Sequence, residues 1–97
     1  MQDSRGPWFL ETTEMLRAAL GSKPSPAQYR AVLSVLYKHM SDRNLADAVG
    51  EAFGVTAERV LNDIYDVVSR RDVSTEDREY VTQRLSSCGF AKWKASE

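Results

Sequence analysis

Apolar side chains recur every three or four residues along most of the chain, and this spacing is typical of amphipathic helices. Glycine, proline, serine and threonine interrupt the pattern, and these residues commonly end helices or cap their first turns. The interruptions predict five helices, at about 8–20, 26–40, 42–53, 57–70 and 75–88. The expected N-terminal caps of the last four are Ser25, Ser41, Thr56 and Ser74. No stretch alternates between polar and apolar side chains over the length of a strand. The pattern therefore predicts an all-α fold, a compact bundle of about five short helices.

The 97 residues suffice for one hydrophobic core and are too few for two. We expect a single domain over 7–93, with flexible ends at 1–6 and 94–97, where polar residues predominate. Phe90 and Trp93 follow the glycine that should end the last helix. Both aromatic side chains are therefore predicted to fold back onto the bundle.

Helical spacing also predicts which side chains face the core. The apolar faces of the first, second and fifth helices are formed by Trp8, Phe9, Leu10, Met15, Leu16, Ala19 and Leu20; by Tyr29, Val32, Leu33, Leu36, Tyr37 and Met40; and by Tyr80, Val81, Leu85 and Cys88. Leu33 and Leu61 are both assigned to the core. We expect alanine at either position to lower the free energy of unfolding by about 2–5 kcal/mol.

The stretch from 45 to 68 has the pattern of two amphipathic helices joined by a sharp break at Gly54. Glycine can adopt the left-handed conformation that ends a helix, and Thr56 can cap the helix that follows. The stretch also fits the loose pattern of a DNA-binding helix-turn-helix at Gly50, Phe53, Gly54, Val55, Thr56 and Val60. Any short helical hairpin closed by glycine and reopened by threonine gives a similar match.

Charge counts against the DNA-binding interpretation. The formal net charge of the chain is −1, and the candidate recognition helix over 56–69 carries three acids against the single Arg59. A helix with a net negative charge is repelled by the phosphates that border a DNA groove. We therefore favour a structural hairpin, and nucleic-acid binding through Arg59, Arg70 and Arg71 is the alternative hypothesis.

Few residues could carry catalysis or bind a metal. The chain has one histidine, His39, and one cysteine, Cys88, so it cannot assemble a familiar zinc site or an intramolecular disulfide. Asp63 and Asp66 share a helix face, but acidic residues on exposed faces are usually only solvated. No glycine-rich phosphate-binding loop is present. We predict a protein that is not an enzyme and has no cofactor and no metal.

The sequence shows neither a signal peptide nor an apolar run of the roughly 20 residues that span a membrane. A single cysteine suits a reducing compartment. The expected location is the cytoplasm, with no membrane partner.

Aromatic side chains are the best candidates for contacts with a partner, since they dominate the energetics of interfaces. Tyr37 and Tyr65 are the better candidates because their neighbours Leu36 and Ile64 already occupy inward positions, and Trp93 is the third candidate. A core position is nevertheless the more common one for each tyrosine, because so small a bundle needs many aromatic side chains. The leading hypothesis is a non-catalytic interaction module that binds a protein partner or a second copy of itself.

The chain over about 26–90 resembles an actinobacterial family of small helical proteins catalogued as a domain of unknown function. The matching positions are Tyr29, Leu33, Met40, Ser41, Asp42, Ser74, Glu76, Asp77, Arg84, Leu85, Gly89 and Phe90. The last helix of that family typically ends in Gly-Trp-Pro, where this chain has glycine, Phe90 and Ala91. The resemblance implies a five-helix bacterial cytoplasmic domain and carries no enzymatic mechanism.

Overall fold

The computed structural model describes residues 6–95, so most of the flexible ends predicted at 1–6 and 94–97 lies outside the described residues, while 94 and 95 belong to a helix. The described chain is an all-α globule without strands, as the sequence predicts. Its helices are α1 (Pro7–Leu20), α2 (Pro26–Leu36), α3 (Asp42–Phe53), α4 (Ala57–Arg70), α5 (Thr75–Ser86) and α6 (Phe90–Ala95). None of them combines the length and the hydrophobicity needed to cross a bilayer.

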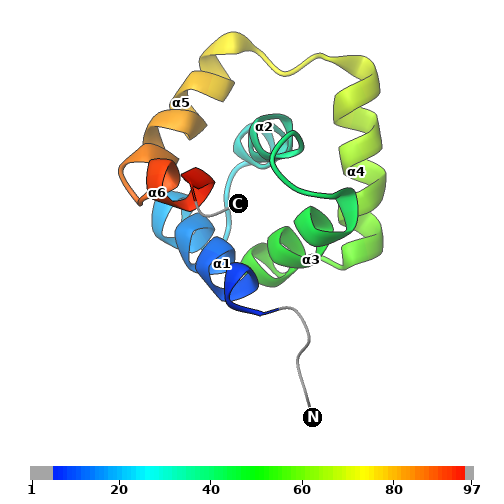
Figure 1. Ribbon diagram of the computed structural model, residues 1–97. Helices are drawn as coiled ribbons and strands as arrows, with labels where there is room; N and C mark the ends of the chain where they lie inside the picture. Colours follow the sequence, from blue (N-terminus) through cyan, green and yellow to red (C-terminus); the bar gives the residue numbers. More distant parts are fainter. Residues whose placement is uncertain (1–5, 96–97) are drawn as a thin grey trace.

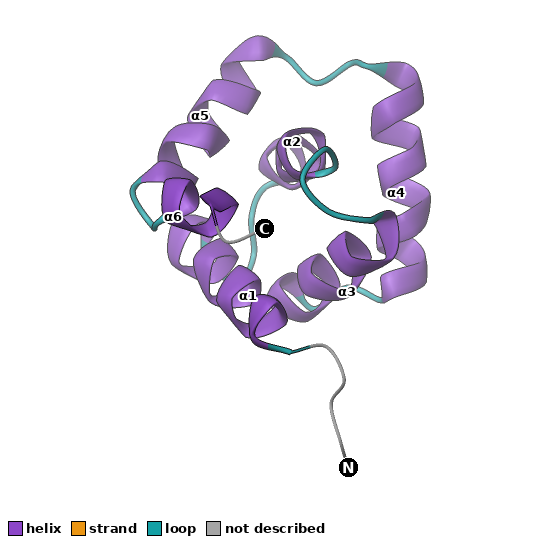
Figure 2. Cartoon of the chain, viewed as in Figure 1, coloured by secondary structure: helices purple, strands orange, loops and turns teal. Residues whose placement is uncertain are grey.

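Helix α2 lies at the centre of the fold. Figure 1 shows it almost end-on, with α1, α3, α4 and α5 arranged around it. It packs against α4 and α5, while α3 packs against α1 and α4. Short loops join the helices (Figure 2), and α6 folds back onto α1 and α5. Four side chains of α2 are fully buried: Ala31, Val32, Leu33 and Leu36.

Helix starts follow the predicted caps. Ser25, Ser41, Thr56 and Ser74 precede α2, α3, α4 and α5, and each side-chain oxygen accepts a hydrogen bond from the backbone N–H three residues later. Gln28 completes a reciprocal capping box at the start of α2, because its side chain accepts from the backbone N–H of Ser25. Local hydrogen bonds therefore fix four of the helix boundaries.

Two helix ends and the last helix differ from the prediction. α2 ends at Leu36 and not at 40, because the chain tightens into a turn in which the His39 N–H donates to the Leu36 carbonyl at 2.9 Å. α5 ends at Ser86 and not at 88, and the segment after Gly89 forms the additional short helix α6. The predicted folding back of this segment is confirmed, since Phe90 is buried.

The buried faces of α1 and α5 agree with the prediction except at single positions. Leu10 is 59% exposed and Tyr80 is 46% exposed, although the helical spacing assigned both to the core. Thr12 and Thr13 are buried instead, and their hydroxyl groups donate to the carbonyl oxygens of Trp8 and Phe9 one turn earlier. A threonine whose hydroxyl is bonded in this way presents its methyl group to the core at little cost.

Candidate functional site

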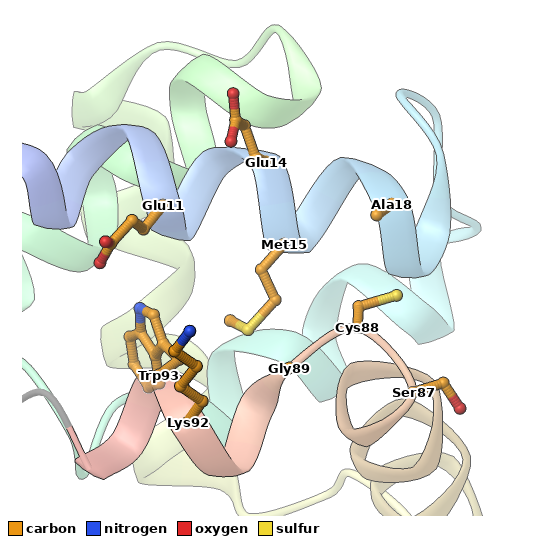
Figure 3. Close-up of a pocket in the computed structure, with 9 residues that line it drawn as sticks. All are labelled: Glu11, Glu14, Met15, Ala18, Ser87, Cys88, Gly89, Lys92 and Trp93. Atoms are coloured by element: carbon orange, nitrogen blue, oxygen red, sulfur yellow. The ribbon is translucent and has the colours of Figure 1, made fainter.

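A cavity of about 590 Å³ lies between α1 and the turn that joins α5 to α6 (Figure 3). Glu11 and Met15 point from α1 toward α6, and Trp93 of α6 points back toward α1. The other lining residues are Glu14, Ala18, Ser87, Cys88, Gly89 and Lys92. The cavity therefore combines apolar contact surface with charged groups.

A second cavity, of about 430 Å³, continues along α1 toward its N-terminus. Its lining residues are Pro7, Trp8, Glu11, Thr12, His39, Met40, Asn44 and Trp93. Glu11 and Trp93 line both cavities, so the two adjoin and together follow α1 from Pro7 to Ala18. At 1.5 Å per residue, this stretch of α1 is about 17 Å long. We call the two cavities together the Trp93 groove.

Trp93 is held in a fixed position within the groove. Its indole N–H donates to the hydroxyl of Thr12 at 2.7 Å, and that hydroxyl in turn donates to the Trp8 carbonyl at 2.6 Å. The indole ring stacks on Phe90 with a centroid distance of 5.7 Å and meets the His39 ring edge-on at 6.1 Å. These contacts on several sides make Trp93 a rigid wall of the groove.

The Trp93 groove is lined by both charged and apolar side chains. Glu11 directs its carboxylate toward α6, where Lys92 contributes an ammonium group, whereas the Glu14 carboxylate points away from α6 (Figure 3). Cys88 lines the first cavity and His39 lines the second. Within residues 6–95, no three histidine, cysteine or acidic side chains are grouped closely enough to hold a metal ion. The groove thus offers aromatic and apolar area with one carboxylate, that of Glu11, and one ammonium group, that of Lys92.

Comparison with known proteins gives no further indication of function. No family model, curated protein or solved structure matches the chain. The functional proposals below therefore rest on the chain's own residues.

The three aromatic residues predicted to contact a partner lie apart from one another. Trp93 lines the groove, whereas Tyr37 follows the end of α2 and lines a different cleft. Tyr65 is 59% exposed on α4 and lines none of these clefts. The sequence identified them by residue type, and only Trp93 belongs to the groove.

The three arginines of the nucleic-acid hypothesis are also separated. Arg59 pairs with Asp63 at 3.3 Å, and Arg70 pairs with Asp66 at 2.7 Å, each one helical turn along α4. Arg71 follows α4 in a left-handed backbone conformation. Two of the three charges are therefore balanced on the helix itself, which lowers their attraction for phosphates.

Asp63 and Asp66, the carboxylates considered for chemistry, both bridge α4 to α2. Asp63 accepts a hydrogen bond from the Tyr29 hydroxyl at 2.6 Å, and burial and this bond together raise the pKa of Tyr29. Asp66 accepts from Arg30 at 2.8 Å, and Arg30 also bonds Asp72 at 2.7 Å. The sequence analysis missed Arg30, because nothing in the spacing reveals that it faces α4.

We expect Asp66→Asn to lower the melting temperature at neutral pH and to have little effect in acid. The hydrogen bond from Arg30, together with the nearby charge of Arg70, holds the pKa of the Asp66 carboxyl below its ordinary value. A lowered pKa stabilises the fold above the unfolded value of about 4 and ceases to do so as the pH falls through the folded value.

Thermal melts of wild type and Asp66→Asn from about pH 2.5 to pH 7 check this expectation. Glu79→Gln is the control, because Glu79 is an exposed carboxylate on α5 without an ion pair among the described residues. Its melting curve should follow the wild type at each pH. A gap between Asp66→Asn and wild type that stays constant into acid would contradict the assignment.

Proposed function

We propose that the protein is a non-catalytic interaction module whose Trp93 groove binds a helix of a protein partner. The observation that carries the proposal is the pair of adjoining cavities along α1, with Trp93 fixed between them by its bond to Thr12. A fixed aromatic side chain loses little conformational entropy on binding, so more of its contact energy appears as affinity.

The dimensions and charge of the groove indicate the kind of segment that fits. A groove of about 17 Å accommodates roughly three turns of a helix, the usual length of helix-in-groove recognition. Met15, Met40 and the two tryptophans supply the apolar contacts, and methionine adapts readily to different side chains. Glu11 lines both cavities and would face a lysine or arginine of the partner. The expected ligand is therefore an amphipathic helix with at least one basic residue.

Glu11→Lys should weaken partner binding by about tenfold or more, because a like charge would then face the basic residue of the partner. Glu79→Lys is the matched control, since it makes the same charge reversal at an exposed position of α5 outside the groove. The measurement is a pull-down from cell extract in which the wild type, Glu11→Lys and Glu79→Lys each serve as the bait. The captured protein is then identified, and its affinity for the three baits is measured.

Cys88 provides an independent check on where the partner binds. It is the only cysteine of the chain and lines the groove, so a bulky maleimide attached there should block the partner without any mutation. A protein that binds Glu11→Lys and the alkylated chain as well as it binds wild type would show that the partner uses another surface. A captured second copy of the chain would assign the groove to self-association.

Nucleic-acid binding through the α3–α4 hairpin is the alternative proposal. The tight turn between the two helices favours it, because the backbone N–H groups of Gly54 and Val55 both donate to the Gly50 carbonyl. The ion pairs of Arg59 and Arg70 count against it. Nuclease treatment of the extract distinguishes the two proposals. A captured complex that dissociates on nuclease treatment, and that binds Arg59→Ala more weakly than wild type, would favour nucleic-acid binding by the hairpin.

A further inference from the structure

A cleft of about 230 Å³ is lined by the end of α2, the end of α4, the loop that joins α4 to α5, and α5 itself. Figure 1 shows that loop running between α4 and α5 at the edge of the fold. Three cationic side chains line it: Lys38 after α2, Arg71 after α4, and Arg78 of α5. The hydroxyl-bearing Ser34 and Tyr37 of the α2 end complete the polar lining, and valines of α4 and the loop provide the rest. None of the described side chains that line it is acidic.

These three cations lack partners among residues 6–95. No ion pair and no side-chain hydrogen bond within that part of the chain engages Lys38, Arg71 or Arg78. The acids near the end of α4 are engaged elsewhere. Asp72 is held by Arg30 at 2.7 Å, and Asp66 is shared by Arg30 and Arg70. A protein with a net charge of −1 thus gathers three uncompensated positive charges at one cleft.

Helix dipoles reduce this positive charge without cancelling it. α2 and α4 both end at the cleft, and each C-terminus carries a partial charge of roughly −0.5. Two such ends offset about one of the three cationic charges. The cleft therefore keeps a net positive charge. Balancing the two helix ends would require only about one of the three cations.

Arg71 is held in an unfavourable backbone conformation. It is the only residue other than glycine with a positive φ, 54°, among residues 6–95. Helix ends of this kind usually use glycine, which adopts the left-handed region without strain. Strained residues often occur at functional sites, where the side chain is needed in that place. The strain at Arg71 is consistent with a role for its guanidinium group in the cleft.

We propose that this cationic cleft binds a phosphate group, either as inorganic phosphate or at the end of a small molecule. Arginine guanidinium groups bind phosphate oxygens in pairs of parallel hydrogen bonds, and lysine adds a point charge. The hydroxyls of Ser34 and Tyr37 can donate to the remaining oxygens. The cleft is smaller than the roughly 300–1,000 Å³ of sites for drug-sized ligands, so it suits the phosphate group and little more.

The test is to titrate the full chain separately with inorganic phosphate, adenosine 5′-monophosphate and adenosine. Backbone amide NMR monitors each titration. Phosphate should shift the amide signals around 34–38, 67–73 and 78, and the shifts should saturate below about 10 mM, which corresponds to weak specific binding. Adenosine should leave these signals unchanged. Tighter binding of the nucleotide than of phosphate would indicate an organic phosphate as the ligand, and equal binding would indicate phosphate itself.

Variants locate the site. Lys38→Gln and Arg78→Gln should each weaken phosphate binding about tenfold, the loss expected for one charged hydrogen bond. Arg71→Gly should weaken it similarly while leaving the melting temperature at or above that of wild type, because glycine relieves the strain. Arg43→Gln is the control, since Arg43 is exposed on α3 and remote from the cleft lining. Shifts that do not saturate, or that are unaltered by the three cleft variants, would overturn the proposal.

Discussion

Replacing Leu33 with alanine should lower the free energy of unfolding by about 2–5 kcal/mol. Leu33 is fully buried in α2, which packs against α4 and α5 at the centre of the fold. Because helices surround α2, they can close only part of the cavity that the missing side chain leaves. A domain of this size is commonly stable by only about 5–15 kcal/mol, so the loss is a large share. Denaturant unfolding followed by circular dichroism measures it.

Leu61→Ala is the matched comparison. The sequence assigned Leu61 to the core and predicted the same cost, but Leu61 is only half-buried on α4. Its side chain loses less contact area, so we expect a cost of about 1 kcal/mol, near the middle of the range for point variants. Equal losses in the two variants would mean that α4 turns Leu61 toward the core. A small loss in Leu33→Ala would mean that the centre of the bundle can repack.

Helix positions could be predicted from the sequence because local interactions determine them. The predicted caps at Ser41, Thr56 and Ser74 are confirmed, since each depends only on the backbone N–H three residues later. The predicted break at Gly54 is confirmed by its left-handed conformation. The sequence does not locate a helix end where no glycine marks it. At the end of α2, the hydrogen bond from the His39 N–H to the Leu36 carbonyl ends the helix earlier than predicted.

The edge of the buried face of α1 could not be predicted, because it depends on packing between helices. Hydropathy favours burying Leu10 over Thr13, yet Leu10 is exposed and Thr13 is buried with its hydroxyl bonded to the Phe9 and Leu10 carbonyls. A side-chain donor that is satisfied within its own helix removes most of the cost of burial. Such bonds are invisible to a scale that ranks residues by type.

The Trp93 groove was predictable only in part. The sequence indicated that Trp93 follows a glycine and should return to the bundle, and it does so. The α1 side of the groove, including Glu11 and Met15, depends on where α6 crosses α1. Similarly, the cleft of Lys38, Arg71 and Arg78 joins residues from three parts of the chain, and no short motif links them.

Gly50→Ala should destabilise the protein by about 1–3 kcal/mol, the range for overpacking a close contact. Helix propensity alone predicts the opposite sign, because alanine is favoured over glycine in a helix by about 1 kcal/mol. A Cβ at position 50 would lie 2.5 Å from the carbonyl oxygen of Val55. The contact is with backbone, so no side chain can rotate away from it. The turn between α3 and α4 would have to open.

Opening that turn affects more than one contact. The Gly50 carbonyl accepts from the N–H groups of both Gly54 and Val55, so moving the turn weakens two hydrogen bonds at once. Arg43→Ala is the control, because Arg43 is exposed in the first turn of the same helix and alanine there tests helix propensity alone. Equilibrium unfolding should show Arg43→Ala close to wild type and Gly50→Ala well below it. If Gly50→Ala proved more stable than wild type, the two helices could not approach as closely as the Gly50 contact requires, and the tight helix-turn-helix geometry would lose its main support.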